Sequence, residues 1–270
     1  MSRPLPVEPI KLIAIDMDGT LMRSDDTVGA KTAKAIDQAI SRGLHVVIAT
    51  MRPPRAVLNT YEALGLDTLQ INHNGALVFD HPTRRTVDHQ PMAPETARKV
   101  VELASKIAPK IAIGAEVIDA IYTNGKSEDT AAAPGHAIRA GSRLEQVLSI
   151  PVTKVLMRGP TGRLGEIQAA IQSELPGCVD FAISHMRLLQ VVRAGVDKAP
   201  ALEKVARHYG VPRHSVMAIG DAPNDLGMMR WAGLSVAVSN AWHDVMNEAH
   251  FVVASNDEDG VAEAITRYAR

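Results

Sequence analysis

The sequence predicts an α/β protein with a doubly wound parallel sheet, into which a separate α+β module is inserted. Short apolar runs alternate with amphipathic helical segments from residue 11 to residue 71, and this alternation returns from residue 198 onward. Such a βαβαβ rhythm is typical of a parallel sheet with helices on its faces. Between the two stretches, hairpin signals and paired apolar runs replace the alternation. The middle of the chain is therefore expected to form the inserted module.

The first expected element is a strand at Lys11–Ile15, a short apolar run that ends next to a glycine-containing turn. Continuous apolar runs of this length suit strands that are buried on both faces of a sheet. A helix is expected at Ala30–Ser41, where apolar residues recur every three or four positions before Gly43. The next expected elements are a strand at Leu44–Ala49, a helix at Arg55–Leu64 and a short strand near Leu69–Ile71.

The middle segment begins with Asn74-Gly75 between two apolar runs, which predicts a hairpin. Its expected strands are Ala76–Phe79, Arg85–Val87, Ile111–Ile113, Val117–Tyr122, Val152–Met157, Val179–Ile183 and Leu188–Val192. Its expected helices are Pro94–Ile107, Arg139–Leu148 and Leu164–Leu175, and the polar stretch Thr123–Gly135 is expected to be a loop. We place the inserted domain at residues 83–188 and the core domain at residues 1–82 and 189–270.

The α/β alternation then resumes and completes the core. The expected elements are a helix at Lys198–His208, a strand at Val216–Ile219, a helix at Asn224–Trp231, a strand at Leu234–Val238 and a last helix at Gly260–Tyr268.

Composition excludes several classes of protein. The 270 residues contain 29 Lys and Arg against 30 Asp and Glu, a net charge of −1, which argues against a dedicated nucleic-acid binder. The single cysteine, Cys178, excludes an intrachain disulfide framework and fits a reducing compartment. No signal-like start and no window of about 20 apolar residues is present, so no membrane association is expected. We expect a soluble cytoplasmic protein, either a monomer or a homodimer.

Four aspartates follow two of the predicted strands. Asp16 and Asp18 come at the end of the first strand, and Asp221 and Asp225 follow the strand at Val216–Ile219. Ligands of open parallel sheets bind at the carboxyl ends of the strands, and clustered carboxylates repel one another unless a cation offsets their charge. Taken singly, each aspartate is explained by a turn or a helix N-cap. Together they favour a site for a hard cation, Mg²⁺ above all.

Four motifs resemble those of the haloacid dehalogenase superfamily of phosphatases. They are Asp16-Met17-Asp18-Gly19-Thr20, Thr50 after the second strand, Lys198 in Gly195-Val196-Asp197-Lys198, and Gly220-Asp221-Ala222-Pro223-Asn224-Asp225. The segment Ile71–Ala76 is similar to the start of the cap in Cof-type members, where an α/β cap is inserted between the second and third motifs. The resemblance covers nearly the whole chain and implies a Rossmann-like core with an inserted cap that closes over the site and supplies specificity.

The resemblance implies a catalytic role for four residues. Asp16 would attack phosphorus and form an aspartyl phosphate. Asp18 would protonate the leaving oxygen and then deprotonate the water that hydrolyses the intermediate. Thr50 would donate a hydrogen bond to the transferring phosphoryl group, and Lys198 would balance the charge on its oxygens.

The resemblance also implies a Mg²⁺ cofactor, which lowers the repulsion between nucleophile and phosphate. Its expected ligands are Asp16, the backbone carbonyl of Asp18, and Asp221. Asp225 is expected to orient the metal site or Lys198 rather than to bind the ion.

Three weaker candidates join Thr50 and Lys198 as predicted substrate-binding residues. Arg52 lies near the second motif, Asn74 near the junction of core and cap, and Asn224 in the fourth motif. A solvent-exposed arginine and an Asn-Gly turn explain Arg52 and Asn74 equally well.

Three positions depart from the family pattern. Met51, Ala199 and Ser239 stand where glycine is usual. A side chain at Met51 would narrow the phosphate site, or strain the backbone if φ must be positive there. None of the three removes a charged catalytic group.

The predicted function is therefore Mg²⁺-dependent hydrolysis of small phosphorylated metabolites, such as sugar phosphates. Two alternatives remain open. A phosphomutase of related fold would pass the phosphoryl group to a second hydroxyl, and a regulatory protein with a weakened site would bind phosphoesters without turnover.

Overall fold

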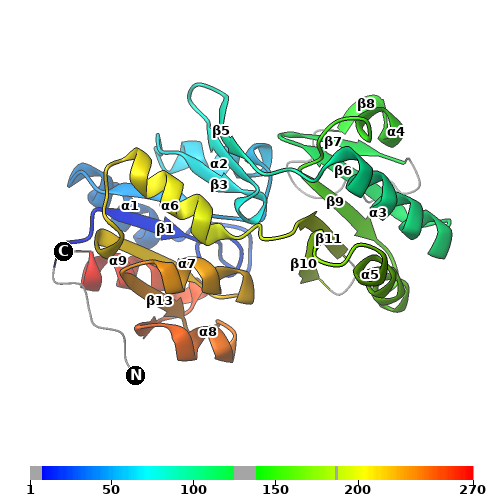
Figure 1. Cartoon of the computed structure of the whole chain (residues 1–270). Helices are drawn as coiled ribbons and strands as arrows, with labels where there is room; N and C mark the ends of the chain where they lie inside the picture. Colours follow the sequence, from blue (N-terminus) through cyan, green and yellow to red (C-terminus); the bar gives the residue numbers. More distant parts are fainter. Residues whose placement is uncertain (1–7, 125–137, 186–187, 270) are drawn as a thin grey trace. The chain divides into compact units, whose positions relative to one another are not determined.

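The computed structural model describes residues 8–124, 138–185 and 188–269, which divide into two compact units (Figure 1). Unit 1 comprises Met1–Arg52, Leu58–Val87 and Asp197–Arg270, and unit 2 comprises Pro53–Val57 and Asp88–Val196. Within the described ranges, no helix combines the length and apolar character needed to cross a membrane.

Unit 1 is built on a five-stranded sheet in which all strands run parallel, in the order β14-β13-β12-β1-β2. The strands are β1 (Leu12–Ile15), β2 (His45–Ile48), β12 (Val216–Gly220), β13 (Leu234–Val238) and β14 (Phe251–Val253). All residues of β1, β12 and β13 are buried, which explains why their sequences are apolar except for Ser235 in β13. Ile15 of β1 pairs with Ile48 of β2 and with Ile219 of β12, so these three neighbouring strands end at nearly the same level.

Helices cover both faces of this sheet. They are α1 (Ala30–Ser41), α2 (Pro54–Ala63), α6 (Lys198–His208), α7 (Leu226–Trp231), α8 (His243–Glu248) and α9 (Gly260–Tyr268). Helix α1 packs on α9, and α6 packs on α7. The chain leaves β1 toward β2 but leaves β12 toward β13, in the opposite direction. Because such crossovers are right-handed, the reversal puts the connecting helices on opposite faces and creates a switch point between β1 and β12.

A small antiparallel sheet extends unit 1. Its strands are β3 (Gln70–Asn72), β4 (Leu77–Asp80) and β5 (Arg85–His89), and the turn between β3 and β4 is the 3₁₀ segment η1 (His73–Gly75). The hairpin predicted from Asn74-Gly75 is confirmed. Both residues have a positive φ, 58° and 95°. A Cβ atom on Gly75 would lie 2.2 Å from the backbone oxygen of Asp197, so only glycine lets the turn approach the chain before Lys198 this closely.

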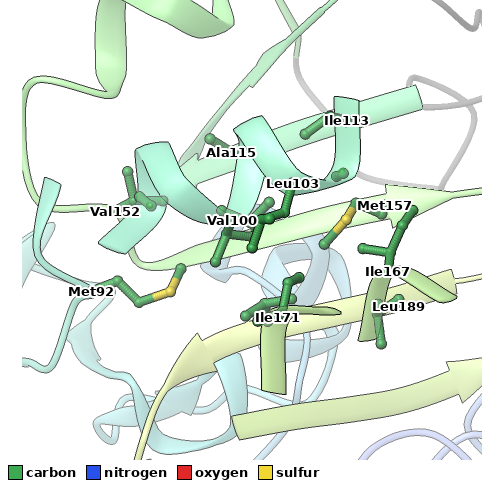
Figure 2. Packing of buried hydrophobic residues seen from close by; sticks show 14 of the residues in the cluster. Met92, Val100, Leu103, Ile113, Ala115, Val152, Met157, Ile167, Ile171 and Leu189 are labelled. Carbon is green, nitrogen blue, oxygen red and sulfur yellow. The ribbon is translucent and has the colours of Figure 1, made fainter. Parts of the chain in front are cut away.

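Unit 2 contains a six-stranded sheet in the order β10-β11-β9-β6-β7-β8, antiparallel except between β7 and β8. The strands are β6 (Ala112–Val117), β7 (Ala120–Thr123), β8 (Ile138–Arg143), β9 (Lys154–Arg158), β10 (Val179–His185) and β11 (Leu188–Arg193). The helices are α3 (Pro94–Ile107), α4 (Leu144–Val147) and α5 (Thr161–Glu174). Side chains of α3 and α5, such as Val100 and Ile171, form one apolar core with those of the strands, such as Met157 (Figure 2).

One predicted element is of the wrong type, and two short elements were missed. The helix expected at Arg139–Leu148 is helical only at Leu144–Val147, and Ile138–Arg143 forms β8 instead. Strand β8 exists because it pairs with β7, a partner that the local apolar spacing does not reveal. Helix α8 and strand β14 were not predicted, because six and three residues are too few for a clear period. Of the loop expected at Thr123–Gly135, residues 125–135 lie outside the described part of the chain.

We expect Gly75→Ala to destabilise the protein by about 2–4 kcal/mol, from the positive φ and the clash with Asp197 together. Gly65→Ala is the matched control and should cost about 1 kcal/mol, since Gly65 also has a positive φ (64°) but a Cβ added there would have nothing within 4 Å. Urea unfolding of both variants measures the difference, and equal losses would contradict the proposed clash.

Candidate active site

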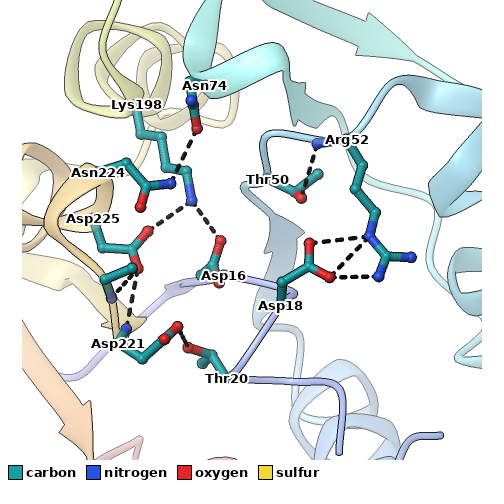
Figure 3. Close-up of polar contacts among 11 residues, drawn as sticks. Asp16, Asp18, Thr20, Thr50, Arg52, Asn74, Lys198, Asp221, Asn224 and Asp225 are labelled. Atoms are coloured by element: carbon teal, nitrogen blue, oxygen red, sulfur yellow. Dashed lines mark hydrogen bonds and ion pairs between the residues drawn. The ribbon is translucent and has the colours of Figure 1, made fainter. Parts of the chain in front are cut away.

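Three aspartates meet at the switch point of the parallel sheet. Asp16 directly follows β1 and Asp221 directly follows β12, so the ends of two adjacent strands bring them together. Asp225 joins them from η4 (Pro223–Asp225), the turn after β12. One carboxylate oxygen from each residue lies within 4.8 Å of the others, and all three residues are buried (Figure 3).

Lys198, the first residue of α6, bridges two of these carboxylates. Its Nζ donates to Oδ1 of Asp16 at 2.5 Å and to Oδ1 of Asp225 at 2.6 Å, and its side chain is fully buried. Asp197 is the N-cap of α6, and its side chain accepts the N–H of Ala199 at 2.7 Å. This cap fixes the start of the helix and thereby the position from which Lys198 reaches the cluster.

Asp225 is fixed on its other oxygen as well. Its Oδ2 accepts the backbone N–H groups of Asp221 and Ala222, each at 3.0 Å. Both oxygens of Asp225 therefore have protein partners. The residue holds Lys198 on one side and the loop that carries Asp221 on the other.

Charge is unbalanced in this cluster, because one ammonium group faces three carboxylates. Burial, together with the charge of Asp225, raises the pKa of Asp16 well above its usual value, and Lys198 offsets this only in part. Burial likewise raises the pKa of Asp221 to about 6, despite a hydrogen bond from Thr20. Burial alone would lower the pKa of Lys198, but Asp16 and Asp225 outweigh it, so the pKa is raised and the lysine stays charged.

The donors present fit a divalent cation of the hard type. Carboxylate oxygens are the preferred ligands of such ions, and a cation beside Asp16 and Asp221 would neutralise the charge that Lys198 leaves uncompensated.

The side chain of Asp18 lies outside this cluster. Its carboxylate is paired with Arg52, whose Nε lies 3.1 Å from Oδ1 and 3.0 Å from Oδ2, while Nη2 donates to Oδ1 (Figure 3). The Asp18 side chain is 44% exposed, whereas that of Asp16 is 6% exposed. The two aspartates of the first motif thus occupy different electrostatic environments.

Thr50, Asn74 and Asn224 lie beside the cluster in three loops, after β2, between β3 and β4, and after β12 (Figure 3). Thr50 is fully buried, and its Oγ1 accepts the backbone N–H of Arg52 at 3.1 Å. The N–H of Asn74 donates to the Thr50 carbonyl at 3.0 Å, and its side-chain oxygen accepts Nδ2 of Asn224 at 3.1 Å. This Asn–Asn pair connects the turn η1 to the loop of the fourth motif.

A family model described as haloacid dehalogenase-like hydrolase matches residues 13–265 of this sequence. The chain belongs to this family. The chain is similar to two phosphatases of Bacillus subtilis (strain 168), YitU and YcsE, both of which are named for 5-amino-6-(5-phospho-D-ribitylamino)uracil. YitU is 32% identical over 268 residues, covering 95% of this chain and 97% of YitU. YcsE is 28% identical over 261 residues, covering 96% of each protein.

A solved structure of a haloacid dehalogenase-like hydrolase from Bacteroides thetaiotaomicron also matches. It has a TM-score of 0.87 and 28% identity, and the match covers 96% of this chain and 99% of that one. Together, these comparisons confirm the predicted family, the α/β fold with a cap region and the enzyme class. The protein is a Cof-type phosphatase, a phosphoric monoester hydrolase that acts on phosphorylated small molecules.

Further residues that the sequence did not single out contact the candidate site. Thr20 donates to Oδ1 of Asp221 at 2.7 Å, and Nδ2 of Asn240 donates to the Gly19 carbonyl at 2.7 Å. Gly19 has a φ of 83°, and a Cβ there would lie 2.6 Å from Oδ2 of Asp221. Thr20 and Gly19 stand inside the first motif, so the motif itself was the available signal. The contact of Asn240 could be found only from the structure, because 221 residues separate it from Gly19.

Two of the departures from the family pattern are accommodated. Met51 does not have a positive φ, so its side chain causes no backbone strain of that kind. Ala199 donates its N–H to the N-cap Asp197, a contact that needs only a backbone amide. Nothing in the structure explains Ser239.

We expect Asp221→Asn to be more stable than the wild type at pH 7 in the absence of divalent cations. The pKa of Asp221 is raised from 3.8 to about 6 in the folded state. The free energy of unfolding therefore falls as pH rises between these values, since the folded protein must give up a proton that it binds more tightly than the unfolded chain does. The gain should be about 1–3 kcal/mol.

Urea unfolding in EDTA at pH 4, 5, 6 and 7 measures this effect, and the gain should vanish near pH 4. Mg²⁺ should stabilise the wild type and have little effect on the variant. A variant less stable than the wild type throughout would show that Asp221 is not under electrostatic strain.

Proposed function

We propose that the protein is a Mg²⁺-dependent phosphatase of small phosphorylated metabolites that works through an aspartyl phosphate on Asp16. The main support is the fully buried Lys198, which bridges Asp16 and Asp225 beside Asp221 at the switch point of the sheet. A buried ammonium between carboxylates supplies a fixed positive charge next to the attacking oxygen, as phosphoryl transfer requires.

In the first step, an oxygen of Asp16 attacks phosphorus and the bond to the leaving oxygen breaks. Lys198 orients the Asp16 carboxylate through Oδ1 and lies close enough to offset charge on the phosphoryl oxygens. The Oγ1 of Thr50 already accepts one N–H, and its own O–H donates to a phosphoryl oxygen in this proposal.

Asp18 is the acid and base of the reaction. Its carboxyl group gives a proton to the leaving oxygen and later takes one from the water that attacks the aspartyl phosphate. Support comes from its position, because a partly exposed carboxylate outside the buried cluster is accessible to a leaving group and to water.

The cation would be held by Asp16, the backbone carbonyl of Asp18 and Asp221. Mg²⁺ supplies a Lewis acid that reduces the repulsion between the nucleophile and the phosphate dianion. Asp225 stays outside the ligand set, since Lys198 and two backbone amides use its oxygens.

We infer that the substrate is the phosphomonoester of a sugar or sugar alcohol. The support is the pair of similar phosphatases, both named for a phosphoribityl compound. Substrate choice is assigned in this proposal to residues 83–188 as the cap and the chemistry to residues 1–82 and 189–270 as the core.

Phosphate release from a panel of phosphomonoesters, with Mg²⁺ or with EDTA, tests the proposal. The panel includes sugar phosphates, sugar alcohol phosphates and 5-amino-6-(5-phospho-D-ribitylamino)uracil. We expect release only with the metal. Isomerised sugar phosphate in place of free phosphate would indicate a mutase, and tight binding without release a regulatory protein.

We expect Asp16→Asn to lower kcat by at least about 10³-fold while the fold is retained, because the amide oxygen is a poor nucleophile. Asp37→Asn, on the exposed face of α1, is the matched control and should keep wild-type activity. Circular dichroism and phosphate release on the same samples separate loss of function from loss of structure. Wild-type turnover in Asp16→Asn would refute the assignment of the nucleophile.

A further inference from the structure

Arg52 contacts Asp18 through one edge of its guanidinium group. Two of its nitrogens, Nε and Nη2, reach both oxygens of the Asp18 carboxylate. Such two-nitrogen pairs of arginine and carboxylate are strong and directional. The sequence predicted Arg52 as a substrate-binding residue, but its described side-chain partner is Asp18.

The backbone of Arg52 is held in place as well. Its N–H donates to Oγ1 of Thr50 at 3.1 Å, and its carbonyl accepts Nδ2 of Asn72 at 3.2 Å and the N–H of His73 at 3.3 Å. Asn72 and His73 are fully buried. Arg52 therefore extends from a rigid segment, and the carboxylate that it holds has a defined position relative to Thr50.

We propose that Arg52 is a positioning residue that holds Asp18 as the general base for hydrolysis of the aspartyl phosphate. This inference rests on the proposed function. When the leaving oxygen has taken the Asp18 proton, Asp18 is a carboxylate, the form that pairs with a guanidinium group. Water then attacks phosphorus, and its proton passes to Asp18. The bond between phosphorus and the Asp16 oxygen breaks, its electron pair returns to Asp16, and inorganic phosphate leaves.

The geometry favours this role over direct substrate binding. Lys198 already supplies a charge beside Asp16, and Thr50 a hydroxyl in the loop after the neighbouring strand (Figure 3). Nε and Nη2 face Asp18, and turning this edge of the guanidinium group to the substrate phosphate would break the contacts with both Asp18 oxygens. Arg52 is also only 24% exposed, and its paired conformation keeps Asp18 away from the three carboxylates.

The two steps can be measured separately with p-nitrophenyl phosphate and Mg²⁺. Its leaving group needs little protonation, so the burst of p-nitrophenolate reports formation of the aspartyl phosphate. Mass spectrometry of acid-quenched protein then gives the phosphorylated fraction. After rapid removal of the substrate, the decay of this fraction gives the rate of hydrolysis of the aspartyl phosphate. The variants are Arg52→Gln and Arg52→Lys, and the control is Arg207→Gln, which removes a 74% exposed arginine paired with Glu203.

We expect Arg52→Gln to slow hydrolysis of the phosphorylated protein about 10- to 100-fold and to raise its steady-state fraction, with the burst rate changed less than about threefold. Arg52→Lys keeps the positive charge but cannot make the two-nitrogen contact, and it should recover part of the hydrolysis rate. If Arg52→Gln does not fold, the Arg52→Lys variant provides the test. Arg207→Gln should behave as the wild type in both steps.

The inference is overturned if KM rises while kcat and the phosphorylated fraction stay unchanged, which would make Arg52 a substrate-binding residue. Equal slowing of both steps would overturn it too. Failure of the wild-type protein to release phosphate from any phosphomonoester would instead refute the proposed function.

Discussion

The contact between Lys198 and two aspartates, Asp16 and Asp225, is the interaction on which the site depends. A buried ammonium is costly unless carboxylates surround it, and buried carboxylates are costly unless a cation lies among them. Each charged group therefore offsets the energetic cost of burying the others. Because the three residues come from β1, α6 and the turn after β12, the triad also ties together segments up to 209 residues apart in the chain.

The positions of the triad residues depend on close backbone packing as well as on their charges. Gly19 and Gly75 leave room for Asp221 and for the carbonyl of Asp197, respectively, where any Cβ would be too close. The N-cap Asp197 and the Asn74–Asn224 pair then fix the loops from which Lys198 and Asp225 extend. Small residues and short polar contacts thus set the distances that the charged groups use, so the motifs include residues with no chemical role of their own.

The sequence was sufficient for the parts of the fold that depend on local patterns. Helices α1, α3, α6 and α9 and strand β13 have the predicted bounds, because long amphipathic or continuous apolar segments determine them. Strand β8 was mistaken for a helix, since only its pairing with β7 defines it.

For the candidate site, the motifs pointed to Asp16, Asp221, Asp225 and Lys198, and the structure brings these four side chains together at the ends of strands and a helix. They did not reveal that Arg52 binds Asp18, because this contact joins two loops and depends on the rotamers of both side chains. Nor did they reveal the contact from Asn240 to Gly19. Contacts between loops are determined by the assembled fold, and a linear pattern carries little information about them.

The two aspartates of the first motif lie in one loop but in two different environments, which suits the two roles proposed for them. Asp16 is buried among other carboxylates and shares Lys198 with Asp225, so its charge is held in a fixed orientation, as a nucleophile requires. Asp18, two residues later, is partly exposed and has a partner of its own in Arg52. Separate environments allow neighbouring carboxyl groups to take different roles in a single reaction. Because Arg52 pairs with Asp18 outside the cluster, three carboxylates rather than four share the charge of Lys198.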